Sequence, residues 1–377
     1  MPTVLRATLV GAIALGPGGC KDDTKSAPET TGAGSGGAST GPGATTSGVA
    51  SSSAGERGVA DSTGGSTGGP PSACAASAIA ISDCIDLAAY TADLEFISEL
   101  RVPGSTHWQA VQDLGADRLT EHGFDVDLFE YGTGVNVIAT REGTMPDAAR
   151  VMVGAHYDHI PDCAGADDNA TGVAAALEIA RVLAEGTFER PLTIALWDEE
   201  EDGLIGSEAF VAAATGQGLA IEAYYNLEML GYASDEPNTQ TIPVGFDLVF
   251  PDEIAVVEAN EFRGDFLFVV ADDLAATQLA TLVAHAERVE LPTIAVSLLA
   301  SQKNNDLFAD LRRSDHAPFW LADYPAIFLT DTGEFRNQRY HCMNGEDTVD
   351  SLVPAFTEQV MRTVAGSAAE SLGLIAP

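Results

Sequence analysis

The sequence has few basic residues. Lys and Arg together number 18 among 377 residues, against 56 Asp and Glu, so the formal net charge is −38 at pH 7. A surface this acidic repels the phosphates of nucleic acids and of anionic lipid headgroups, so neither is an expected partner. Most of the acids favour solubility, and only a few can belong to a functional site.

Long apolar runs are also missing. Near the N-terminus, Ala7–Leu15 is too short to span a bilayer, but after the single cation Arg6 it is typical of a secretory signal peptide. The run ends in a Pro-Gly-Gly-Cys sequence that resembles a bacterial lipoprotein signal, with Cys20 as the lipidated residue. Pro17 stands where an aliphatic residue is usual. We expect residues 1–20 to direct export, with the product either a lipoprotein of the outer membrane or periplasm or an untethered secreted protein.

Large apolar residues are nearly absent from the next segment. Residues 21–73 are mostly Gly, Ser, Thr, Ala and Pro. Such a segment cannot bury enough surface to offset its chain entropy, so we expect a disordered linker. Residues 74–377 are long enough for one domain with a full core, and they contain no repeat of fixed period.

The folded part alternates between apolar β-type runs and helical patterns. The expected strands are Val135–Thr140, Arg150–Ala155, Leu192–Trp197, Ala223–Met229, Thr293–Leu298 and Ala326–Thr330, and the expected helices are Trp108–His122, Thr171–Leu183, Leu274–Val289 and Ser351–Val364. This alternation predicts an α/β three-layer sandwich, in which helices flank a mostly parallel central sheet. In such sheets functional sites gather at the carboxyl ends of the strands.

Six polar motifs follow these strands. They are Gly154–His159 (GAHYDH), Gly165–Gly172 (GADDNATG), Asp198–Gly203 (DEEEDG), Asn226–Gly231 (NLEMLG), Ser314–His316 (SDH) and Tyr340–Cys342 (YHC) with Asp347 and Thr348 shortly after. Taken singly, each has an ordinary alternative: a histidine that ends a strand, an Asp or Asn that caps a helix, or a solvated acidic loop. However, the five consecutive acids Asp198–Asp202 repel one another unless cations neutralise them. A carboxylate at Glu228, within or just past an apolar strand, is costly without a partner.

Together, the motifs resemble those of the M28 family of zinc peptidases, which includes bacterial aminopeptidases and the related glutaminyl cyclases. The resemblance extends from Leu94 to the C-terminal helix, and GADDNATG followed by EEDGLIGS is a specific pairing. It implies a zinc exopeptidase fold with two zinc ions. The implied metal ligands are His156, Asp168, Glu201, Glu228 and His341, with Asp168 bridging both ions.

The same resemblance assigns the remaining roles. Glu200 is the implied general base, Asp158 orients the His156 ring, and Asp315 and His316 match a nearby motif of less defined role. Two departures from the family pattern stand out. Many members have Asp at the position of Glu228, and the segment from His341 to Asp347 is slightly expanded.

Four cysteines remain if Cys20 carries lipid, and an even number in an exported protein favours two disulfides. Cys74 and Cys84 are close in sequence. Cys163 follows one proposed metal-binding loop and Cys342 follows a proposed ligand, so Cys163–Cys342 is a reasonable second bridge if those loops converge. Free thiols are the alternative.

The expected function is removal of N-terminal residues from peptide substrates, by a water that two metals activate and Glu200 deprotonates. The alternatives are a carboxypeptidase, a glutaminyl cyclase-type acyltransferase that uses one zinc, and a binding domain that has lost catalysis. The sequence leaves the substrate side chain and the oligomeric state open. It places the side-chain pocket between Ala233 and Phe268 and around Trp320.

Overall fold

The computed structural model describes residues 73–375. The proposed signal peptide (1–20), the lipid attachment site at Cys20 and all of the proposed linker (21–73) except its last residue lie outside the described residues. No helix in the described part of the chain is long and apolar enough to cross a membrane.

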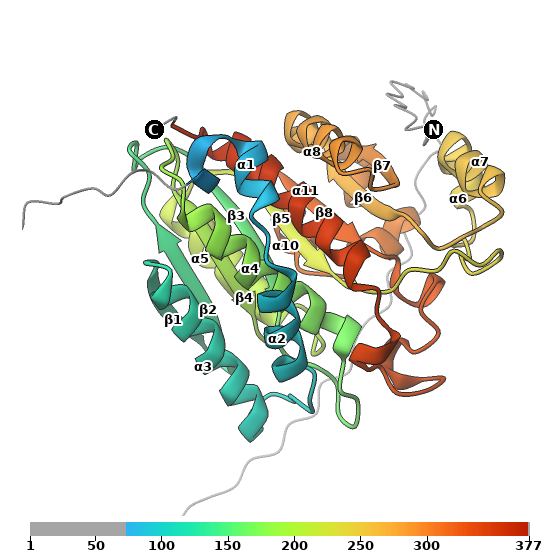
Figure 1. Cartoon of the computed structure of the whole chain (residues 1–377), viewed down its shortest axis with the longest axis horizontal. Helices are drawn as coiled ribbons and strands as arrows, with labels where there is room; N and C mark the ends of the chain where they lie inside the picture. Colours follow the sequence, from blue (N-terminus) through green and yellow to red (C-terminus); the bar gives the residue numbers. More distant parts are fainter. Residues whose placement is uncertain (1–72, 376–377) are drawn as a thin grey trace, which may run out of the picture. The chain divides into compact units, whose positions relative to one another are not determined.

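One eight-stranded sheet organises the fold, in the order β1-β2-β4-β3-β5-β8-β6-β7 (Figure 1). The strands are β1 (Asp125–Tyr131), β2 (Gly134–Arg141), β3 (Arg150–His156), β4 (Leu192–Trp197), β5 (Ile221–Glu228), β6 (Leu267–Asp272), β7 (Thr293–Leu298) and β8 (Ala326–Thr330). The central strands β4, β3, β5 and β8 are parallel to one another, and β6 and β7 form a second parallel pair. Antiparallel pairings join β1 to β2, β2 to β4 and β6 to β8.

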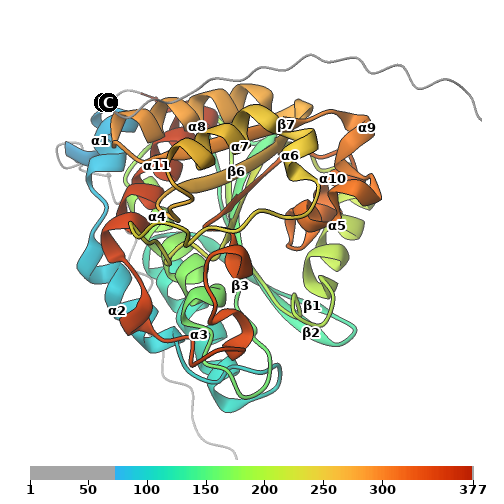
Figure 2. The same cartoon turned by 90° about the vertical axis from the view of Figure 1, so that its right-hand side faces the viewer.

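Helices cover both faces of this sheet, which Figure 2 shows nearly edge-on. The helices are α1 (Ala78–Asp83), α2 (Leu87–Ile97), α3 (Thr106–Glu121), α4 (Gly172–Ala184), α5 (Ile205–Gln217), α6 (Phe246–Val249), α7 (Pro251–Ala259), α8 (Ala276–Arg288), α9 (Ala300–Lys303), α10 (His316–Leu321) and α11 (Pro354–Leu372). One apolar core lies between the sheet and helices α1–α4, α8 and α11, and a second lies between the opposite face and α5, α6 and α10. The predicted α/β sandwich is therefore confirmed.

The pattern of burial explains this architecture. Strands β4 and β8 are buried along their whole length, as parallel strands covered on both faces must be. Helix α4 is rich in Ala and almost completely buried, so its backbone packs close to the sheet. The parallel strands end at one edge of the sheet, and three of them carry proposed site residues in their last residue or in the loop that follows.

Candidate metal centre and active site

The proposed ligands come from five separate places in the chain. His156 and Glu228 are the last residues of β3 and β5, and Glu201 lies in the loop after β4. Asp168 lies in the turn Ala166–Thr171 that leads into α4, and His341 lies in the short turn Tyr340–Cys342 after β8. Because β4, β3 and β5 are neighbours, their carboxyl ends bring these side chains together.

Two groups form around Asp168. On one side, Nε2 of His156 lies 3.3 Å from Oδ1 of Asp168 and 3.4 Å from Oε2 of Glu228. On the other side, Nε2 of His341 lies 3.3 Å from Oδ2 of Asp168 and 3.1 Å from Oε2 of Glu201. Asp168 thus directs one carboxylate oxygen at each histidine. The carboxylate of Asp168 therefore contacts both groups.

The imidazole nitrogens and carboxylate oxygens of this cluster are better placed to bind metal ions than to hydrogen-bond to one another. Nε2 of His341 and Oε1 of Glu201 are buried and form no hydrogen bond of good geometry, although charged groups lie within 3.1 Å of each. The set contains imidazole nitrogens and carboxylate oxygens and no thiolate, which suits zinc with positions left for water. Burial raises the pKa of Glu228, as expected for a carboxylate that lacks a full counter-charge.

Asp158 connects the first histidine to the acidic loop. Its Oδ1 lies 3.4 Å from Nδ1 of His156. Its two oxygens also accept hydrogen bonds from the backbone N–H groups of Glu200 and Glu201, at 3.1 and 3.2 Å. Asp158 therefore lies against the ring of His156 and holds the loop that carries Glu200 and Glu201 through two backbone hydrogen bonds.

Glu200 lies beside this centre. A carboxylate oxygen of Glu200 lies within 4.8 Å of ligand atoms of His156 and Glu228. Burial, together with the negative charges of Glu228 and Asp315, raises the pKa of Glu200 well above its usual value. A carboxyl group so placed can exchange a proton with a reacting group in the site.

Hydrogen bonds to neighbouring residues hold the two carboxylate ligands in place. Ser314 donates to Oε2 of Glu228 at 2.7 Å, and Asn226 donates to Ser314. The loop that carries Asp168 is held by Asp347, whose Oδ2 accepts from the N–H groups of Asp167 and Asp168. The motif after His341 therefore positions Asp168 as well.

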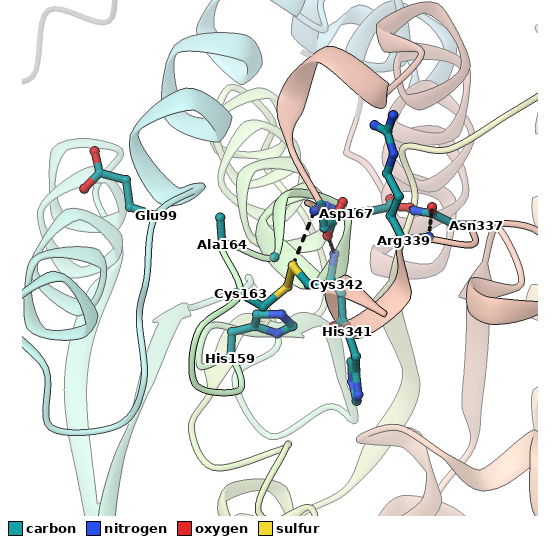
Figure 3. Close-up of a disulfide and its surroundings, with 12 residues drawn as sticks. Glu99, His159, Cys163, Ala164, Asp167, Asn337, Arg339, His341 and Cys342 are labelled. Carbon is teal, nitrogen blue, oxygen red and sulfur yellow. Dashed lines mark hydrogen bonds and ion pairs between the residues drawn. A yellow bond between two sulfur atoms is a disulfide. The ribbon is translucent and has the colours of Figure 1, made fainter. Parts of the chain in front are cut away.

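Both predicted disulfides are present, Cys74–Cys84 and Cys163–Cys342. The second joins the loop after β3 to the turn that carries His341, and Figure 3 shows it between His159 and His341. His341 and Cys342 both have left-handed backbone conformations, with φ of 52° and 55°, which non-glycine residues rarely adopt. The disulfide helps to hold His341 in this costly conformation.

We expect the Cys163→Ser/Cys342→Ser double variant to lose about 2–5 kcal/mol of unfolding free energy. It should also lose metal more readily, because the His341 turn is no longer tied down. The Cys74→Ser/Cys84→Ser variant is the matched control, since that disulfide lies away from the metal ligands; it should lose stability while keeping its metal. Urea unfolding and metal analysis after dialysis measure both effects. Equal metal retention in the two variants would contradict the assigned role of Cys163–Cys342.

A deep apolar cavity opens beside the acidic cluster. Its space amounts to about 980 Å³, part of which is open solvent, and Asp168, Glu200, Glu201 and Glu228 lie on its wall. The apolar part of its lining is Ile242, Phe246, Phe250, Ile254, Val257, Phe266, Phe268, Ile294, Val296, Leu311 and Phe328. The stretch 233–268 therefore contributes to the pocket as predicted. Of the region around Trp320, Leu311, Arg313 and Phe328 line the cavity, whereas the ring of Trp320 itself is fully buried and donates to the carbonyl of Ala326.

Two polar side chains at this cavity were not assigned from the sequence. The ring of Tyr340 stacks on that of His341, with centroids 3.8 Å apart. Arg313 donates to the Tyr340 hydroxyl at 3.1 Å and forms an ion pair with Glu334. Their positions in the sequence could have indicated a role in the site, because Tyr340 adjoins a proposed ligand and Arg313 precedes the Ser314–His316 motif.

The residues of the Ser314–His316 motif differ in their surroundings. Asp315 is buried near the centre, and burial raises its pKa to about 7. His316 points away from the metal ligands: its Nε2 lies 2.7 Å from the carbonyl of Leu311, and its ring stacks on Phe328. Burial lowers the pKa of His316 to about 3, so this ring is neutral and serves the packing.

His159 is a further residue that sequence reasoning left without a role. Its Nδ1 lies 2.7 Å from Oε1 of Glu201, and its ring is edge-to-face with that of His341. It therefore contacts the second group of proposed ligands directly. The GAHYDH motif could have indicated this contact, since His159 lies three residues after His156.

Comparison with known proteins agrees with this geometry. Residues 136–259 match the model of Peptidase family M28, which confirms the resemblance indicated by the motifs. An uncharacterized Escherichia coli protein, YfbL, is 30% identical over 217 residues, covering 55% of this chain and 62% of that protein. A probable zinc metalloprotease of Leptosphaeria maculans is 28% identical over 226 residues, covering 56% of this chain and 50% of its own length. The alignments thus span between half and two thirds of these relatives.

Solved structures share the fold at low sequence identity. The LapA aminopeptidase of Legionella pneumophila superposes with a TM-score of 0.61 at 19% identity, covering 79% of this chain and 72% of that one. A glutaminyl cyclase of Macrostomum lignano gives a TM-score of 0.56 at 15% identity, covering 80% and 94%. The fold alone therefore does not separate a peptidase from a cyclase.

Proposed function

We propose that this chain, whose residues 136–259 match peptidase family M28, is a zinc-dependent aminopeptidase with two zinc ions. The observation that carries the proposal is the geometry of Asp168. Its two oxygens face two histidines from distant parts of the chain, each accompanied by a further carboxylate. In the proposed assignment His156 and Glu228 would hold one ion, Glu201 and His341 would hold the other, and Asp168 would serve as a ligand to both.

When bound, two zinc ions supply Lewis acidity that lowers the pKa of a water and polarises the scissile carbonyl. Glu200 accepts the proton of the attacking water and delivers it to the leaving amine. Asp158 keeps the ring of His156 in its orientation during the reaction. The apolar cavity excludes bulk water from one side of the site, which strengthens the electrostatic interactions within it.

Tyr340 is the proposed donor to the developing oxyanion. Burial raises its pKa, so the hydroxyl keeps its proton at neutral pH. Since Arg313 donates to the oxygen of that hydroxyl, the Tyr340 proton is free to point towards the reacting carbonyl. Arg313 is itself paired with Glu334. It is thus not a free cation for a terminal carboxylate, which favours an aminopeptidase over a carboxypeptidase.

The test is a single assay on purified protein, with and without a chelator. The substrates are aminoacyl anilides, amino-blocked peptides, carboxy-blocked peptides and a peptide with N-terminal Gln. We expect hydrolysis of the anilides and of the carboxy-blocked peptides, and loss of activity with the chelator. Cyclisation of the Gln peptide with one zinc per chain would instead support the cyclase alternative.

The cavity also predicts which N-terminal side chains are preferred. Burying a Leu or Phe side chain yields about 1.5–3 kcal/mol relative to exposure, so kcat/KM for Leu or Phe anilides should exceed that for Gly by about 10- to 150-fold. Asp and Glu anilides should be poor substrates, because the cavity is mostly apolar and the acids Glu253 and Asp310, which are not proposed metal ligands, also line it. Kinetics on the matched series measure this, with the N-acetylated Leu anilide as control. A preference for acidic or Gly residues would argue against the cavity as the side-chain pocket.

Export belongs to the proposal as well. Both disulfides join residues of the folded domain, and structural disulfides persist in oxidising compartments. We therefore place the mature protein outside the cytoplasm, with peptides as substrates and with Cys20 as the lipid attachment site in the lipoprotein form.

A further inference from the structure

Arg101 is fully buried beneath the metal centre. Its hydrogen bonds all go to backbone carbonyl oxygens, and it bonds no carboxylate. Burying a guanidinium is costly, and here only carboxylates that it does not hydrogen-bond offset that cost. Such an arrangement points to a specific structural task for the side chain.

The bonds of Arg101 join two loops that carry site residues. Its Nε donates at 3.0 Å to the carbonyl of Tyr157, the residue between His156 and Asp158. Its Nη2 donates at 2.8 Å to the carbonyl of Gly165 and at 2.9 Å to that of Asp168 itself. One planar group thus fixes the end of β3 and the loop of the bridging carboxylate relative to each other.

The charge of Arg101 also matches its surroundings. Its guanidinium lies within electrostatic range of the carboxylates of Asp168, Asp158, Asp347 and Glu201. The guanidinium of an arginine is a cation at neutral pH. It provides positive charge next to a group of acids that lack metal in the unloaded protein.

We propose that Arg101 is the positioning residue of the metal centre: it holds Asp168 opposite His156 before metal binds and offsets part of the negative charge there. The inference rests on the proposed metal-dependent function. The fork of the guanidinium is essential to it, because donors on three nitrogens reach carbonyls on both loops. A lysine would keep the charge but carries its donors on one nitrogen, so it cannot bond both loops in the same way.

The test compares Arg101→Lys with Arg336→Lys. Arg336 is a matched control because it is also buried and also bonds backbone carbonyls, those of Tyr232 and Phe266, but bonds no proposed ligand; its Nε donates to the Gln240 side chain. Zinc affinity is measured by competition with a chromophoric chelator, and folding is checked by near-UV circular dichroism. We expect Arg101→Lys to bind zinc about 10- to 100-fold more weakly than the unaltered protein, and Arg336→Lys to bind it normally. Unchanged affinity in Arg101→Lys, or equal weakening in both variants, overturns the proposal.

Hydrogen exchange on the unaltered, metal-free protein tests the same inference without a mutation. If Arg101 holds the loop, amides of residues 163–170 exchange slowly before zinc is added. Exchange at the unprotected rate, with protection only after zinc binds, contradicts the positioning role even if Arg101→Lys fails to fold. If the unaltered protein binds no zinc, the proposed function fails, while slow exchange in this loop would still support Arg101 as the group that fixes it.

Discussion

Glu200→Gln should abolish most peptide hydrolysis while leaving the metal in place. The amide keeps the size of the side chain but cannot accept the proton of the attacking water, and loss of a general base typically lowers kcat by about 10²- to 10⁴-fold. Glu200 lies within 4.8 Å of ligand atoms of His156 and Glu228, so metal content must be measured on the same preparation as activity. An inactive variant with two zinc ions identifies a base, and one that has lost zinc identifies a ligand.

Glu199→Gln is the matched control for this experiment. Glu199 is the preceding acid in the same loop, and its carboxylate accepts a hydrogen bond from Thr133. Replacing it should leave kcat near that of the unaltered protein. If Glu199→Gln were inactive and Glu200→Gln active, the alignment of the acidic motif would be wrong by one residue.

Asp168→Ala should release both metal ions, whereas His341→Ala should weaken mainly one. Asp168 is the only proposed ligand that faces both histidines, so its removal takes a donor from each site. The carbonyl that Arg101 bonds belongs to the backbone and remains in the variant. Metal analysis after dialysis should find close to no zinc in Asp168→Ala and about one ion in His341→Ala.

The matching variant for the other site is His156→Ala. It should also retain about one ion, held by the Glu201–His341 side, and activity should be lost in all three variants. If Asp168→Ala kept one tightly bound zinc ion, the carboxylate would serve a single site and the bridging arrangement would be incorrect.

Strongly apolar elements were predictable from the sequence. Three strands have the predicted bounds: Leu192–Trp197, Thr293–Leu298 and Ala326–Thr330. A short β-branched or apolar run between turns leaves little choice of where the strand begins and ends. The ends of β3 and β5 were predictable to within two residues. Hence the parallel sheet, and the edge at which the polar motifs gather, followed from hydrophobic pattern alone.

Elements with weaker patterns were missed for physical reasons. Strand β1 (Asp125–Tyr131) lies at the sheet edge with no fully buried residue, so its sequence is half charged and lacks an apolar run. Helix α5 (Ile205–Gln217) carries many small residues and a narrow apolar face. For these two elements tertiary packing, which a local pattern does not contain, decides the structure. Strand β6 (Leu267–Asp272) is apolar and as long as β4 and β7, so its own pattern was sufficient to predict it.

The sequence predicted the proposed ligands and base, but not the residues that hold their loops in place. Motif order identified the residues that converge, whereas Arg101 lies 55 residues before His156 in a segment without any recognisable signal. Its role depends on backbone carbonyls, which every sequence contains. The contact of His159 with Glu201 likewise depends on where the two loops meet in space.

The most direct test is a crystal structure of the zinc-loaded protein with anomalous data collected at the zinc edge. Two peaks should flank the Asp168 carboxylate, one beside His156 and Glu228 and the other beside Glu201 and His341. A single peak, or peaks bound by other residues, would show that the five side chains do not form a two-metal centre.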